Sequence, residues 1–192
     1  QAMLIKEPDN PYFRSFEGGM LTLSAFLSKK PDRVVYWGTS GERITDGYSF
    51  DSFGLAELVG SSVLLYGKDI RTELKYPAFY ELYADVKYHY ETIRKYAQST
   101  GRSFYSFGCM LDIARCIYTL RTGKIIAKTE AAEWALENNL CPDPTDLETA
   151  LKVRKNSMEY KDDKAIFDYA EAFAEPIQRF ADVLENELKV RK

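Results

Sequence analysis

The chain has 192 residues, of which 45% are hydrophobic and 29% are charged, and this composition is typical of a globular protein with a buried core. Its 26 Lys and Arg against 29 Asp and Glu give a formal net charge of −3, which argues against nucleic-acid binding because that function usually needs a basic surface. The single histidine, His89, and three scattered cysteines disfavour a zinc site, a disulfide framework and a Ser-His-Asp triad.

The sequence shows no sign of a membrane protein or of an export signal. No stretch approaches the roughly 20 apolar residues of a membrane span. The first residues, 1–6, lack the basic-then-apolar pattern of a signal peptide. We therefore expect a cytoplasmic protein without a membrane partner.

The first third of the chain is expected to mix strands and helices. Short apolar runs indicate strands, and apolar residues at helical spacing indicate helices. The expected elements are strands at 1–5, 33–37 and 63–66, helices at 12–27 and 51–59, and a Gly-, Ser- and Thr-rich loop at 38–47. This pattern is typical of part of an α/β or α+β layer.

After Pro77 the hydrophobic period becomes 3.6 residues and stays so to the C-terminal end. Ser103, Thr129 and Thr145 are the expected N-caps of the second, third and fourth helices. The five expected helices cover 77–100, 103–122, 129 through at least 134, a stretch from 145, and 163–189 with a kink at Pro176. The fold class is therefore mainly α: an antiparallel helical bundle over residues 69–192, preceded by a partial α/β segment over residues 1–68.

The second expected helix carries a polar seam on an otherwise apolar circumference, so we expect it to be central. The seam consists of Gly108, Asp112, Arg115, Thr119 and Thr122, whose spacings keep them within a wedge of about 80°. A buried guanidinium is costly to desolvate unless it meets an anion. That anion is either Asp112, in an internal ion pair, or an external phosphate, and the sequence leaves both open.

The next stretch carries a motif. It consists of a helical Arg, the turn Thr122-Gly123-Lys124, a second lysine at Lys128, and a helix with the pattern Ala-x-x-Trp-Ala over 131–135. This run resembles the C-terminal helical domain of the aminoglycoside adenylyltransferases that modify streptomycin and spectinomycin, and of related bacterial nucleotidyltransferases. The resemblance covers about residues 50–140.

The resemblance implies a role for two cations. In the family the helical Arg and the second Lys reach the phosphates of ATP, and they match Arg115 and Lys128, 13 positions apart. A lysine at the start of a helix suits this role because unpaired backbone N–H groups there favour an anion. Lys124 is a weaker candidate, since a solvated cation beside the turn is the simpler interpretation. Asp112, Tyr105 and Thr119 are candidates for a substrate cleft.

Two motifs that the resemblance leads us to expect do not occur in this sequence. Nucleotidyl transfer of this type uses a Gly-Ser turn followed by an Asp-x-Asp pair that holds Mg²⁺. Gly60-Ser61-Ser62 has no carboxylate pair after it, and no Asp-x-Asp occurs. We therefore expect residues 1–68 to be a remnant of the catalytic domain. We expect ATP and Mg²⁺ to be cofactors of the intact, longer enzyme and neither to be bound strongly by this chain alone. These 192 residues alone should have negligible transferase activity.

Two functions remain as hypotheses. In the first, the chain is the C-terminal portion of an ATP-dependent enzyme that transfers an adenylyl group to a hydroxyl of a small molecule, with an aminoglycoside as one candidate acceptor. Residues 101–108 contain no carboxylate for a cationic drug, which leaves the acceptor open. In the second, the chain is a non-catalytic helical-bundle interaction module that pairs with a separate catalytic chain. Homo-oligomerisation is compatible with either.

Overall fold

The chain forms two compact units, Gln1–Phe50 and Asp51–Lys192. In this computed structural model the described residues are 6, 7, 9, 10, 18–28, 33–37, 43–46 and 51–191. The second unit includes a helix over Ser52–Gly60 that the sequence-based assignment placed with the first domain.

The described part of the first unit contains a three-stranded antiparallel sheet. Its strands, in the order β1-β2-β3, are β1 (Gly18–Met20), β2 (Val34–Trp37) and β3 (Arg43–Thr45). Gly18 lies opposite Trp37, and Val34 lies opposite Thr45. A short helix, α3 (Leu23–Ser28), follows β1.

The structure corrects two expectations in this unit and confirms one. The strand at 33–37 is confirmed as β2, but the helix expected at 12–27 is wrong at residues 18–20, which form β1. The loop expected at 38–47 contains strand β3. Apolar spacing alone favoured a helix here, but the glycine pair at 18–19 has low helix propensity and interrupts the helical pattern. The strand expected at 1–5 lies outside the described residues.

The second unit begins with α4 (Ser52–Gly60), close to the helix expected at 51–59. Asp51 is its N-cap, and its carboxylate accepts the Gly54 N–H at 2.7 Å. The strand expected at 63–66 is wrong, because these residues have no regular secondary structure. All four side chains are exposed, so this apolar run adds little to the core.

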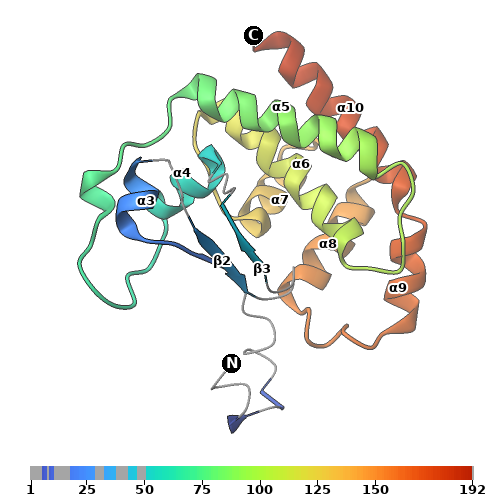
Figure 1. The fold of residues 1–192 in the computed structure, drawn as a ribbon. Helices are drawn as coiled ribbons and strands as arrows, with labels where there is room; N and C mark the ends of the chain where they lie inside the picture. The colour runs from blue at the N-terminus through green and yellow to red at the C-terminus, as the bar shows by residue number, and fades with distance from the viewer. Residues whose placement is uncertain are drawn as a thin grey trace. The chain divides into compact units, whose positions relative to one another are not determined.

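Six α-helices follow a 3₁₀ turn at Arg71–Glu73 and confirm that the fold is mainly helical (Figure 1). They are α5 (Phe79–Tyr96), α6 (Tyr105–Thr122), α7 (Lys128–Glu137), α8 (Pro144–Lys155), α9 (Lys164–Glu171) and α10 (Ala174–Val190). Helix α6 packs against all five of the others, which confirms its predicted central position. Helix α4 packs against α5.

The helix ends show which local signals were effective. Gly123 ends α6 in the left-handed conformation, with φ of +69°, as a glycine C-cap should. The cap expected at Thr129 is wrong, because α7 begins one residue earlier and Ala127 precedes it. There the Glu130 carboxylate accepts a hydrogen bond from the Ala127 N–H at 3.1 Å, so a backbone donor at the helix start is satisfied by Glu130 and not by Thr129.

Three further expectations about helix ends are wrong. Helix α6 has Phe104 as its N-cap, and α8 begins at Pro144, before the expected cap. The single helix expected at 163–189 is two helices separated at residues 172–173. Pro176 lies in the first turn of α10 and causes no kink, because the N–H groups of that turn need no partner within the helix.

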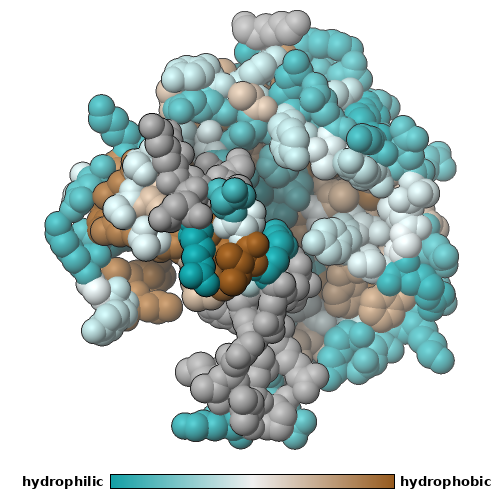
Figure 2. Space-filling view, viewed as in Figure 1, coloured by the Kyte–Doolittle hydropathy of each residue, from teal (hydrophilic) through white to brown (hydrophobic). Residues whose placement is uncertain are grey.

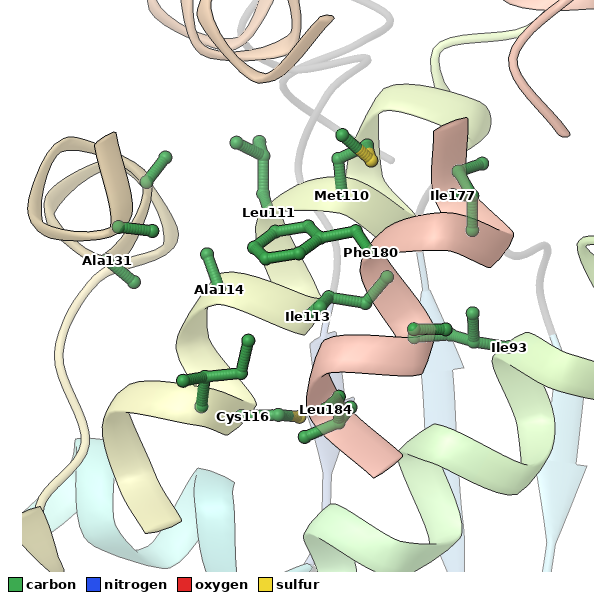
Figure 3. Packing of buried hydrophobic residues seen from close by; sticks show 14 of the residues in the cluster. Ile93, Met110, Leu111, Ile113, Ala114, Cys116, Ala131, Ile177, Phe180 and Leu184 are labelled. Atoms are coloured by element: carbon green, nitrogen blue, oxygen red, sulfur yellow. The ribbon is translucent and has the colours of Figure 1, made fainter. Parts of the chain in front are cut away.

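The core of the second unit surrounds α6 (Figure 3). Its largest fully buried side chains are Leu82, Phe107, Met110, Leu111, Ile113, Ile117, Leu120, Leu147, Phe173, Ile177, Phe180 and Leu184. The visible surface around α8 and α9 is, in contrast, mostly hydrophilic or neutral (Figure 2). Burial of this apolar surface is the main force that fixes the helix positions, and with them the site described below.

Candidate functional site

Four charged side chains from three helices meet in the second unit: Glu57 of α4, Asp112 and Arg115 of α6, and Lys128 of α7. Arg115 donates from Nη2 to Asp112 Oδ1 at 2.9 Å and from Nη1 to Glu57 Oε1 at 2.6 Å. Lys128 Nζ donates to Asp112 Oδ2 at 2.8 Å. We call these four residues the charge cluster.

The local sequence explains how the helices bring these groups together. Asp112 and Arg115 are three residues apart, so they lie on the same face of α6. The Gly123 turn directs the chain back, and Lys128 is the first residue of α7. Helix α7 packs closely on α6 because its core-facing residues are alanines with no exposed surface, namely Ala131, Ala132 and Ala135.

Burial differs strongly among the four side chains. The exposed fraction is 9% for Arg115, 19% for Asp112, 28% for Lys128 and 45% for Glu57. The Arg115 guanidinium also lies 5.1 Å from the centre of the Phe53 ring. Its Nε is buried and has no hydrogen-bond partner among the described residues. The internal ion pair that the sequence left open therefore forms, yet one donor of the guanidinium is unmatched.

His89 lies next to the charge cluster. Its ring stacks on Phe53 with the ring centres 5.1 Å apart. Burial lowers the pKa of His89 below its usual value because the imidazolium is poorly solvated there, while the charges of Asp112 and Arg115 act in opposite directions. We therefore expect the neutral imidazole to face the cluster at neutral pH.

The lowered pKa of His89 predicts a pH dependence of stability. The unfolded chain takes up a proton on His89 near pH 6.5, whereas the folded chain does so only at lower pH, so the free energy of unfolding falls as the pH drops below about 6.5. His89→Gln removes this effect. Urea unfolding at pH 7.5 and 5.5 should show a smaller loss at the lower pH for the variant than for the wild type. Equal losses would contradict the prediction.

The other residues predicted from sequence lie outside the charge cluster. Thr119 is fully buried, and its hydroxyl donates to the Arg115 carbonyl at 2.9 Å. Tyr105 is 86% exposed and begins α6, two helical turns before Asp112. Lys124 is exposed in the turn after α6. The structure thus brings Asp112, Arg115 and Lys128 together and leaves Lys124, Tyr105 and Thr119 apart from them.

Sequence analysis missed Phe53, Glu57 and His89 as members or neighbours of this site. Glu57 is the only acidic residue within α4. A single carboxylate on a short, mostly apolar helix is the one sequence feature that could have indicated a role for it. No spacing within the sequence connects α4 to α6, because their approach is a tertiary contact. Phe53 and His89 carry no motif at all.

Metal-ligand groups and cysteine thiols are two other kinds of group that carry chemistry in proteins. Over the described ranges, no group of three or more His, Cys, Asp or Glu side chains is placed to hold a metal ion. The three cysteines are free, and burial raises the pKa of the Cys109 thiol to about 11 and that of Cys116 further. These thiols are therefore protonated at neutral pH. No described helix is long and apolar enough to cross a membrane.

Comparison with known families supports the interpretation of α5–α10. The family model described as "Aminoglycoside adenylyltransferase, C-terminal domain" matches residues 83–179, half of the chain. This range includes Asp112, Arg115 and Lys128 and excludes Glu57. A comparison with curated proteins finds no match. The chain belongs to the family of aminoglycoside adenylyltransferase C-terminal domains.

Proposed function

We propose that this chain is the helical portion of an ATP-dependent nucleotidyltransferase and that Arg115 and Lys128 bind the nucleotide phosphates. The observation that carries the proposal is the arrangement of these two cations. They come from different helices, they are held at 2.9 and 2.8 Å by the same carboxylate, and Arg115 Nε has no partner among the described residues. A phosphate group offers several acceptor oxygens to such donors.

The two cations suit phosphate binding for different reasons. Arg115 is a planar, delocalised cation fixed by burial, whereas Lys128 is a point charge on a long stem at the first position of α7, held in place by Asp112. The N–H groups of that first turn add to the positive potential. In adenylyl transfer the two side chains would neutralise the β- and γ-phosphates and stabilise the departing pyrophosphate.

The reaction we propose is adenylyl transfer from ATP to a hydroxyl of a small molecule, with an aminoglycoside as the acceptor class that the family name implies. Mg²⁺ would supply charge neutralisation at the phosphates when bound. The described residues form no site for it, and the proposal assigns to this chain only the phosphate contacts. Residues 101–108 contain no carboxylate, so cationic groups of an acceptor would be held elsewhere.

Titration calorimetry of the 192-residue chain with ATP tests the proposal. Loss of one charged hydrogen bond weakens binding by about tenfold or more, so Arg115→Lys and Lys128→Gln should each raise the Kd for ATP by that factor. Lys124→Gln removes the same charge from the nearby exposed turn and should leave the Kd unchanged. Saturating ATP should also stabilise the wild type, by about 2.7 kcal/mol at 100 times the Kd.

The same titration distinguishes the alternative function, a non-catalytic interaction module that pairs with a separate catalytic chain. The observation that favours this alternative is that both cations already have carboxylate partners. If the wild type neither binds ATP nor gains stability from it, the charge cluster is structural and the alternative holds. Equal Kd values for Lys124→Gln and Lys128→Gln would also count against the phosphate role.

A further inference from the structure

The two carboxylates of the charge cluster differ in their contacts. Asp112 uses both oxygens, one for Arg115 and one for Lys128, and its side chain is only 19% exposed. Among the described residues, the Glu57 carboxylate has Arg115 as its one partner, through Oε1, and its side chain is 45% exposed. Asp112 also shares α6 with Arg115, whereas Glu57 comes from α4; Figure 1 labels these two helices. The two groups are therefore unequal partners of the same guanidinium.

We propose that Asp112 is a positioning residue that holds Arg115 and Lys128 together for an incoming phosphate, and that Glu57 is the carboxylate which this phosphate displaces from Arg115. The inference rests on the proposed function, because it assumes that the two cations bind a nucleotide. It assigns different roles to the two carboxylates: Asp112 positions the cations, and Glu57 is displaced. Composition and spacing alone do not distinguish these roles.

The role of Asp112 follows from the flexibility of lysine. A lysine side chain has four rotatable methylene groups and a strongly hydrated ammonium, so without a partner it samples many positions in water. Asp112 Oδ2 fixes Lys128 Nζ at 2.8 Å while Oδ1 holds Arg115 on the same carboxylate. Ordering the two cations before a ligand arrives lowers the entropic cost of binding. In this proposal, the entropy saved by ordering the two cations in advance outweighs the electrostatic repulsion between the Asp112 carboxylate and the phosphate, because Asp112 stays paired with both cations.

The role of Glu57 follows from its exposure and from the donors it leaves behind. A carboxylate that is 45% exposed can return to water at a small cost, since half-exposed ion pairs contribute little. Its departure frees Arg115 Nη1, next to an Nε that has no partner among the described residues. A phosphate carries more negative charge than a carboxylate and more acceptor oxygens, so it competes well for the same guanidinium.

Asp112→Asn and Glu57→Gln form a matched pair for the test. Each replaces a carboxylate by an amide of nearly the same shape and removes one negative charge from the same cluster. If only the total charge mattered, both variants would bind ATP more tightly. The proposal predicts opposite signs: the Kd should rise about tenfold for Asp112→Asn and fall by roughly threefold for Glu57→Gln, where a competing partner of marginal energy is lost. Calorimetry with ATP and with inorganic tripolyphosphate, at one ionic strength, measures both.

A double-mutant cycle separates positioning from a general structural effect. Lys128→Gln should raise the Kd about tenfold in the wild-type background but have little effect in the Asp112→Asn background, because Lys128 is no longer ordered there. Asp112→Glu keeps the charge and displaces it by one methylene, so weaker binding is expected for this variant too. It also serves as the test if Asp112→Asn does not fold.

The outcomes distinguish this inference from the proposed function. The different roles of Asp112 and Glu57 are contradicted if both Asp112→Asn and Glu57→Gln bind ATP more tightly, or if the Kd of either variant is unchanged. In those cases the phosphate role of Arg115 and Lys128 stands. An unchanged Kd for Asp112→Glu would contradict the different roles as well. If the wild type binds neither ATP nor tripolyphosphate, the proposed function itself fails, and the inference fails with it.

Discussion

Replacing Phe180 by alanine should lower the free energy of unfolding by about 3–5 kcal/mol, the range for a large side chain removed from a packed core. Phe180 of α10 is fully buried, and its ring points toward α6, among Leu111, Ile113 and Ala114 (Figure 3). Its loss leaves a cavity beside the central helix, which the rigid surroundings fill only in part. Urea unfolding followed by circular dichroism measures the change.

Phe79→Ala is the matched control, because it removes the same ring from a position that is 43% exposed. Burial of a side chain contributes in proportion to the apolar area withdrawn from water, so the control should lose only about 1 kcal/mol. Similar losses for the two variants would show that α10 does not form part of the core around α6. Because no hydrogen bond or ion pair among the described residues joins α10 to the four side chains of the charge cluster, ATP binding by folded Phe180→Ala should be nearly unaffected.

Ala131→Leu should have the second largest effect. Ala131 of α7 has no exposed surface and lies one helical turn after Lys128. A leucine there forces α7 away from α6, and overpacking of this kind costs about 1–3 kcal/mol of stability. The same displacement should move Lys128 away from Asp112 and weaken ATP binding. Urea unfolding and calorimetry on the same preparation measure both changes.

Ala165→Leu is the control for added volume, because Ala165 lies exposed near the start of α9. It should change neither stability nor the Kd for ATP appreciably. If Ala131→Leu is as stable as the wild type, the contact between α6 and α7 is looser than the structure shows. If its stability falls but the Kd is unchanged, the position of Lys128 does not depend on close packing of these helices.

The helical part of the fold was predictable because its signals are local. An apolar period of 3.6 residues over more than a hundred positions places α5 to α8, and Gly123 ends α6 as expected. The errors lie where local signals compete. Thr129 is a good cap by residue type, but Glu130 satisfies the Ala127 N–H instead. The apolar run 63–66 has strand-like residues but pairs with none of the described strands, so sequence preference alone did not decide its structure.

The candidate site was predictable to the extent that it lies on neighbouring helices. Asp112 and Arg115 share one face of α6 by spacing, and the motif around Gly123 connects them to Lys128. Glu57 could not be found in this way, because it is 58 residues from Arg115 in the sequence and no periodicity connects the two. Phe53 and His89 reach the site through the same packing of α4 on α5.

The sequence by itself determined that this protein is mainly helical and that α6 is central, because periodicity and residue type act over a few turns of helix. Its resemblance to a family motif is what singled out Arg115 and Lys128. Only the tertiary structure decided which anions meet those cations. Asp112 bridges them and Glu57 arrives from α4, because burial of apolar surface sets where the helices lie, and the helix positions set which charges come within hydrogen-bonding distance.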